Sequence, residues 1–168
     1  MKKLKKFKNF CRALTNLHEI ETKSPPYDVI TTAGMVALFA ICFEQSWRAM
    51  KETLKRQGFD EKKIDSPRKI IKQAFAAGMI DDEELWLEML TARTNATHSY
   101  NAEEVAPKII YAVQKKFIAL FEALKTEIEI INGIALPLDA TSLCLKTEIE
   151  ITNCAALPLD ATSLCCYV

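Results

Sequence analysis

Residues 29–56 read VITTAGMVALFAICFEQSWRAMKETLKR, and this stretch decides the fold class. Apolar residues recur in it at steps of three and four, at Met35, Leu38, Phe39, Cys42, Phe43, Trp47, Met50 and Leu54. That spacing is the period of an α-helix with an apolar face. The stretch is nearly all apolar before Glu44 and amphipathic after it. We therefore expect a central, well-buried helix that stops near Gly58.

Helical patterns also occur on both sides of this stretch. A preceding amphipathic helix ends at Ser24-Pro25-Pro26, because consecutive prolines cannot continue a helix. It bears Leu4, Phe7, Phe10, Cys11, Leu14 and Leu17. Ser66-Pro67 is a typical helix start, with a capping side chain before the proline, and Gly78 ends that short helix. Asp81 and Asp82 supply the negative charge favoured at the start of a fourth helix.

The apolar period disappears between Thr94 and Tyr100, which predicts a break in the chain. A fifth helix follows and reaches Leu124, and Pro107 implies either a late start or a kink. Five helices with short connections predict an all-α, up-and-down helical bundle over residues 1–125. We expect Trp47 and Trp86 to fill its core.

Residues 126–168 form a tail of a different kind. LKTEIEIINGIALPLDATSLC, from position 124, is followed from position 145 by LKTEIEITNCAALPLDATSLC, and 18 of 21 positions match. Residues 126–130 and 147–151 alternate polar and apolar, so each copy offers a short strand. The first copy could instead prolong the fifth helix. Identity this high indicates a recent duplication or a non-native segment, and the tail, irregular or short-stranded, is assigned no biochemical role.

Composition excludes several classes of protein. The 168 residues include 22 Lys and Arg, 22 Asp and Glu, and 49% apolar residues, which rules out a disordered chain or a disulfide-dense mini-protein. The longest uncharged, apolar-rich run, residues 29–43, is shorter than the ~20 residues of a membrane span. No secretory signal precedes it, so we expect a cytoplasmic protein without a membrane segment. Cysteines and histidines lack zinc-site spacing, and no nucleotide-binding loop is present, so we expect neither metal nor cofactor.

Two residues near the predicted break could carry chemistry. Arg93 lies on the apolar stripe of the fourth helix, where a guanidinium needs an anion or a carboxylate such as Glu44. His98 lies five positions later, about 140° around an unbroken helix, and a break at Asn95 and Ala96 could turn it back. An imidazole beside a fixed cation is the minimum apparatus for metal-free RNA cleavage. The alternative is a structural Arg–carboxylate pair and a loop histidine.

The residues from Arg93 to Tyr100, RTNATHSY, resemble the R-x4-H-x-Y motif of the HEPN family. These are small helical-bundle proteins of the nucleotidyltransferase substrate-binding type. FEQSW at positions 43–47 is similar to the family's F-E-x-x-W helix. SPR at 66–68, followed by AFAAGMIDD at 74–82, is similar to its S-P-R…A-F-x-x-G-x-I-D-D stretch, and the ordered set spans about residues 1–125.

The resemblance implies a homodimer in which Arg and His of both protomers line one cleft. It implies a metal-independent endoribonuclease toxin acting on tRNA or mRNA, and a cognate minimal nucleotidyltransferase as antitoxin. Carried over by position, Arg93 stabilises the phosphate, His98 is the general acid and base, and Tyr100 is a target for AMPylation by the partner. Relatives often place Asn directly after the arginine, where this chain has Thr94 and then Asn95. The alternative function is a non-catalytic accessory subunit of a nucleotidyltransferase.

Overall fold

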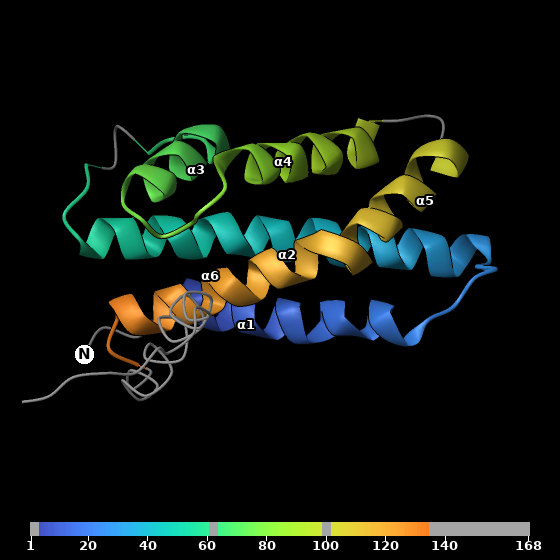
Figure 1. Ribbon diagram of the computed structural model, residues 1–168, viewed down its shortest axis with the longest axis horizontal. Coiled ribbons are helices and arrows are strands. Elements are labelled where there is room, and N and C mark those ends of the chain that lie inside the picture. The colour runs from blue at the N-terminus through green and yellow to red at the C-terminus, as the bar shows by residue number, and fades with distance from the viewer. Residues whose placement is uncertain (1–3, 61–63, 99–101, 135–168) are drawn as a thin grey trace, which may run out of the picture. The chain divides into compact units, whose positions relative to one another are not determined.

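Figure 1 shows the computed structural model, which describes residues 4–60, 64–98 and 102–134. All its regular elements are helical, as predicted: α1 Lys5–Leu17, η1 His18–Thr22, α2 Val29–Arg56, α3 Pro67–Ala76, α4 Glu83–His98, α5 Ala102–Ala112, η3 Val113–Phe117 and α6 Ile118–Ile131. The last three elements follow one another without a gap. They correspond to the predicted fifth helix, and η3 is a short π-helical segment within it.

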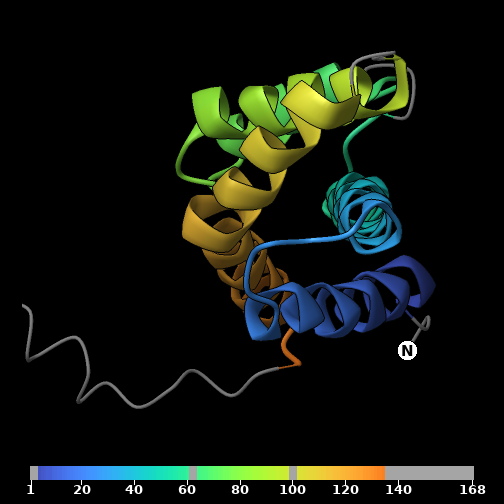
Figure 2. The same cartoon turned by 90° about the vertical axis from the view of Figure 1, so that its right-hand side faces the viewer.

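Helix α2 is the centre of the arrangement. Figure 2 looks along α2 and shows α1 on one side, α3 and α4 on the opposite side, and α5–α6 on a third side. No helix of the described residues covers the fourth side. The expectation of an all-α bundle is confirmed, and its core is aromatic: ring centroids lie 5.6 Å apart between Phe39 and Phe117, and 5.6 Å apart between Trp86 and Phe121.

The expected burial of α2 along its whole length is wrong for its first half. Val29 is 83% exposed, Ile30 85% and Ile41 53%, and Ala33 and Ala37 are exposed between them. Met35 and Phe39, on the opposite face, are buried. Hydropathy registers both faces of a helix and cannot show that a neighbouring helix covers only one of them.

The same feature bears on the expected absence of a membrane segment. By length and composition, α2 is apolar enough to cross a membrane, with an 18-residue window of mean hydropathy 1.5, of which 28% is buried. Counting only the uncharged run at residues 29–43 is therefore too strict a test for a membrane-spanning helix. The core helix of a soluble protein passes the same test, so cytoplasmic location stays a prediction.

The predicted break after Thr94 is wrong at its start, because α4 continues to His98. Met89 is buried, and Ala92 and Ala96 pack against the core at helical spacing. The apolar face that includes Met89 therefore continues toward the end of α4, formed there by the alanines at 92 and 96. A late start at Pro107 is also wrong: α5 begins at Ala102 and contains Pro107.

The start of the first repeat copy, residues 124–131, is helical and not a strand, because α6 runs to Ile131. Leu124 and Ile128 are buried four residues apart, whereas Ile130 is 51% exposed. A strand would place Ile128 and Ile130 on one face, so helical packing prevails over the local alternation. The second copy, and with it the strand at residues 147–151, lies outside the described residues.

The helix ends mostly follow their sequence signals. The Asp82 carboxylate accepts from the Leu85 backbone N–H at 2.9 Å and caps α4, as its position predicts. Gly58 and Gly78 have φ of 92° and 69°, a conformation that favours glycine, and end α2 and α3. Ser66 occupies the N-cap position of α3 but its side chain makes no capping hydrogen bond, which corrects that expectation.

Candidate functional site

Arg93 and Glu44 meet where α4 lies against α2. Nη2 of Arg93 is 3.7 Å from Oε2 of Glu44, and the two side chains are 37% and 27% exposed. The sequence named Glu44 as a carboxylate that could meet Arg93. The structure shows that the Glu44 side chain is partly exposed and that it also faces Arg93.

Glu44 also gathers two neighbours from its own helix. Its Oε2 accepts from Nε1 of Trp47 at 3.1 Å, and its Oε1 accepts from Nη2 of Arg48 at 2.5 Å. The Arg48 guanidinium lies over the Trp47 ring, 5.4 Å from its centroid. Trp47 is therefore only partly buried and belongs to this cluster, contrary to the expectation that it fills the core.

Arg48 is the residue that sequence reasoning missed. Glu44, Trp47 and Arg48 are spaced three and four apart on α2, which places them on one helical face. An i,i+4 Glu–Arg pair is common on any exposed helix, so the spacing alone does not signal a site. Only the packing of α4 on α2 reveals that Arg48 and Arg93 share one carboxylate.

The charge of this cluster favours an anion. Two guanidinium groups surround one carboxylate, so Glu44, Arg48 and Arg93 carry a formal net charge of +1. Exposed ion pairs contribute only about 0–1 kcal/mol each, so a phosphate can compete with the carboxylate for either arginine. Guanidinium forks match phosphate oxygens in geometry. The arrangement is therefore suited to holding a phosphodiester at the surface.

The other predicted site residues lie at or beyond the end of α4. Position 98 is the last residue of the helix, and five residues of unbroken helix place it about 140° around the axis from position 93. Within one chain, the two positions therefore lie on different faces of α4. The Thr94 hydroxyl donates to the Leu90 carbonyl at 2.9 Å, and Asn95 is exposed. Tyr100 lies outside the described residues.

The second histidine of the chain, His18, lies far from Arg93 in the sequence and makes two contacts of its own. Its Nδ1 lies 2.6 Å from Glu21 and its Nε2 lies 2.8 Å from Glu122, so it links η1 to α6. Hydrogen bonds that the imidazole donates to the carboxylates of Glu21, first, and Glu122 raise the pKa of His18 above its usual value. Within the described part of the chain, no cluster of His, Cys, Asp or Glu could hold a metal ion.

The fold and this cluster define a small helical-bundle protein, and comparison with known proteins identifies its family. The model of the nucleotidyltransferase substrate binding protein-like family matches residues 5–130, so the chain belongs to that family. A crystal structure of a protein from Thermus thermophilus is similar, with a TM-score of 0.61 and 24% identity. The match covers 71% of this chain and 98% of the other, and it shows the shared fold. No curated protein matches.

Proposed function

We propose that this chain is the toxin of a toxin–antitoxin pair, a metal-independent endoribonuclease whose site contains Arg93 and His98. The observation that carries the proposal is the cluster in which Arg48 and Arg93 flank Glu44 at the surface. The HEPN-like R-x4-H motif supports the same reading. Arg48 is our addition to the residues that the motif suggests.

The proposed chemistry needs one base and one cation at the scissile phosphate. His98 removes the 2′-hydroxyl proton, the freed oxygen attacks the adjacent phosphorus, and the bond to the 5′-oxygen breaks. The leaving 5′-oxygen takes a proton from the protonated His98 imidazole. The products are a 2′,3′-cyclic phosphate and a 5′-hydroxyl. Arg93 and Arg48 stabilise the negative charge that builds on the phosphate oxygens.

A homodimer completes this site. Helices α2 and α4 run antiparallel in Figure 1, and the Arg93–Glu44 contact fixes their register. Moving five residues from Arg93 to position 98, about 7.5 Å, corresponds to moving from Glu44 back to the region of Ala37 and Ile41. The end of α4 is therefore level with the exposed apolar stripe of α2, which consists of Ile30, Ala33, Ala37 and Ile41.

That stripe is the proposed contact with a second copy of the chain. The alanines at 33 and 37 allow two α2 helices to approach closely. The stripe is also level with the end of α4, where position 98 lies. A two-fold contact there brings two α4 ends together, so that Arg93 of one protomer can serve with His98 of the other. One protomer alone holds the two positions on different faces of α4.

The antitoxin in this proposal is a cognate minimal nucleotidyltransferase that transfers AMP onto Tyr100. A phosphorylated adduct two residues from His98 blocks the cleft and repels RNA phosphates. Co-expression with that partner should add the mass of AMP to the peptide containing Tyr100, and Tyr100→Phe should abolish the addition. An unmodified peptide beside an active partner would remove AMPylation from the account.

The second candidate is a non-catalytic subunit that presents substrate, or itself, to the nucleotidyltransferase. The family description, which refers to substrate binding, favours it. Incubation of purified protein with tRNA and mRNA separates the two candidates. The nuclease proposal expects products with 2′,3′-cyclic phosphate ends, lost in both Arg93→Ala and His98→Ala. An intact RNA pool, with complex formation unchanged in both variants, supports the accessory subunit.

A further inference from the structure

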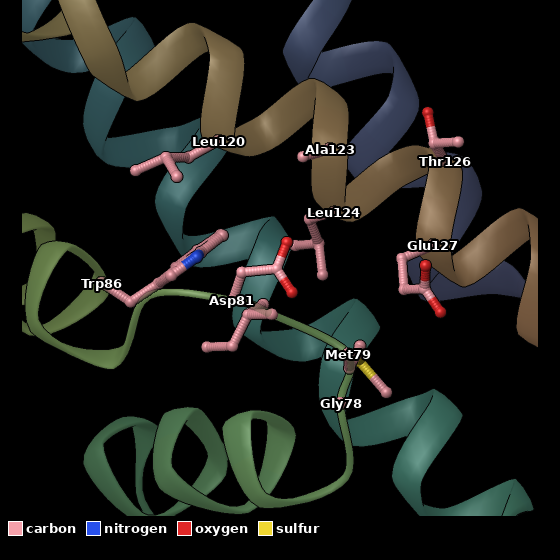
Figure 3. A pocket seen from close by; sticks show the side chains of 10 residues that line it. Gly78, Met79, Asp81, Trp86, Leu120, Ala123, Leu124, Thr126 and Glu127 are labelled. Carbon is pink, nitrogen blue, oxygen red and sulfur yellow. The ribbon is translucent and has the colours of Figure 1, made fainter. Parts of the chain in front are cut away.

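A pocket of ≈ 310 Å³ lies away from Glu44 and Arg93, between the α3–α4 connection, the first turn of α4 and the face of α6 (Figure 3). Its walls are largely apolar, formed by Met79, Trp86, Leu120 and Leu124. Asp81 and Glu127 lie on opposite elements that border it. The volume is at the lower end of the range for small-molecule sites.

Within the described part of the chain, neither carboxylate is paired with a cation. Among the described residues, neither Asp81 nor Glu127 makes a hydrogen bond or an ion pair, and the residues that line the pocket include no lysine or arginine. The neighbouring acids are committed elsewhere: Asp82 caps α4, and Glu83 lies 3.9 Å from Lys72. Two negative charges beside apolar walls create a field that favours a cation in the pocket.

The Trp86 indole adds an independent observation. The side chain is 1% exposed, and within the described part of the chain its Nε1 donates to no acceptor. The other tryptophan, Trp47, donates its Nε1 to Glu44. Nε1 is not among the described buried atoms that lack a partner, so this N–H is accessible to solvent, and Trp86 lines the pocket. The pocket therefore offers a donor in addition to two charged acceptors.

We propose that this pocket binds a small organic cation: an ammonium or guanidinium group on an apolar body that also carries a hydrogen-bond acceptor. The cationic head lies between Asp81 and Glu127, the body packs on Met79 and Leu124, and the acceptor receives the Trp86 N–H. The same chemistry occurs in a free amine and in a basic side chain of a protein partner. The site is independent of RNA cleavage, since Arg93 and Glu44 do not line it.

Tryptophan NMR tests the proposal directly, because the chain has only two indoles, Trp47 and Trp86. The probe is tyramine, an aromatic ammonium with a phenolic oxygen, titrated into the full chain. Its neutral isostere is 4-hydroxyphenylethanol, and Trp47→Phe assigns the two resonances. Tyramine should shift the Trp86 indole resonance and leave Trp47 unmoved. The alcohol should bind roughly tenfold more weakly, as expected for loss of a charged hydrogen bond.

Matched variants locate the cation. Glu127→Gln and Asp81→Asn should each weaken tyramine binding roughly tenfold. Glu129→Gln, which makes the same charge change on α6 outside the pocket, should not. A parallel titration with Nα-acetyl-lysine N-methylamide identifies the source: tighter binding of this probe indicates a protein side chain, and tighter binding of tyramine indicates a free amine. A Trp86 resonance unmoved by both cations, or equal binding of the alcohol, would overturn the proposal.

Discussion

Arg93 of α4 and Glu44 of α2 are joined by a 3.7 Å contact between Nη2 and Oε2. The same carboxylate accepts from Arg48 at 2.5 Å, so one acid controls the positions of two guanidinium groups. In the proposed function, this cluster is the surface at which the RNA phosphate binds. Glu44 is a positioning residue in this account, because it competes with the phosphate for the arginines.

Glu44→Gln should separate binding from catalysis. The amide retains an acceptor for the Trp47 N–H but no longer competes for Arg48 and Arg93, so KM for RNA should fall. The kcat should fall as well, because the Glu44 carboxylate no longer positions the two guanidinium groups. The pairs are exposed, so the free energy of unfolding should drop by less than about 1 kcal/mol per pair. Glu88→Gln, which removes an ion pair with Lys116, is the control; a raised KM in Glu44→Gln would contradict this role.

Removing the hydroxyl groups of Thr53 and Ser46 should change the free energy of unfolding in opposite directions. Both are fully buried on α2, but the Ser46 hydroxyl donates to the Phe43 carbonyl at 2.7 Å, whereas Thr53 Oγ1 has no partner among the residues that the structure describes. Thr53→Val should raise the free energy of unfolding by about 1 kcal/mol, and Ser46→Ala should lower it by about 1 kcal/mol. Urea denaturation measures both. Destabilisation by Thr53→Val would mean that its hydroxyl is satisfied.

The links from His18 to Glu21 and Glu122 predict a pH-dependent stability. Because the folded-state pKa of His18 is raised, its contribution is complete below the unfolded pKa, near 6.5, and is lost as pH rises through the folded pKa. The side chain is 39% exposed, so solvent screening limits the effect to less than about 1 kcal/mol. His18→Gln should flatten this part of the stability profile, which lies above about pH 6.5. A profile identical to that of the wild type would show that these contacts do not contribute.

The apolar stripe of α2 predicts a dimer that a single charge disrupts. Ile30→Glu should convert the protein to a monomer in sedimentation velocity, with little effect on the thermal midpoint because Ile30 is 85% exposed. Phe75→Glu, at an exposed apolar residue of α3, is the control and should stay dimeric. A wild-type monomer at tens of micromolar, or wild-type binding to neutral lipid vesicles through this stripe, would contradict the proposed contact.

The sequence predicts most of the fold because its signals are local. Glycines with positive φ mark the ends of α2 and α3 at Gly58 and Gly78, and Pro25-Pro26 follows η1, which ends at Thr22. Local signals fail where tertiary contacts determine where a helix ends or whether a segment is helical. The alanines at 92 and 96 extend α4 by packing on the core, and Ile128 is buried in a helix although its surroundings alternate like a strand.

The candidate site is predictable only in part for a related reason. The motif identifies Arg93, and its position on an apolar stripe indicates that it needs an anionic neighbour. The packing of α4 on α2 decides which carboxylate pairs with Arg93 and whether Arg48 joins the pair. Helical spacing within one helix carries no information about how two helices pack. The exposure of the first half of α2 is invisible to hydropathy in the same way, because exposure depends on which neighbouring helices are present.

Mixed dimers test the central claim, that Arg93 of one protomer and His98 of the other form one RNA-cleaving site. Arg93→Ala and His98→Ala chains, each inactive alone, are co-expressed in equal amounts and assayed for RNA cleavage. Half of the dimers are mixed and each regains one of its two sites, so activity should return to about a quarter of the wild-type value. Cleavage that stays at the level of the single variants, in mixed dimers shown to form, would contradict the shared site.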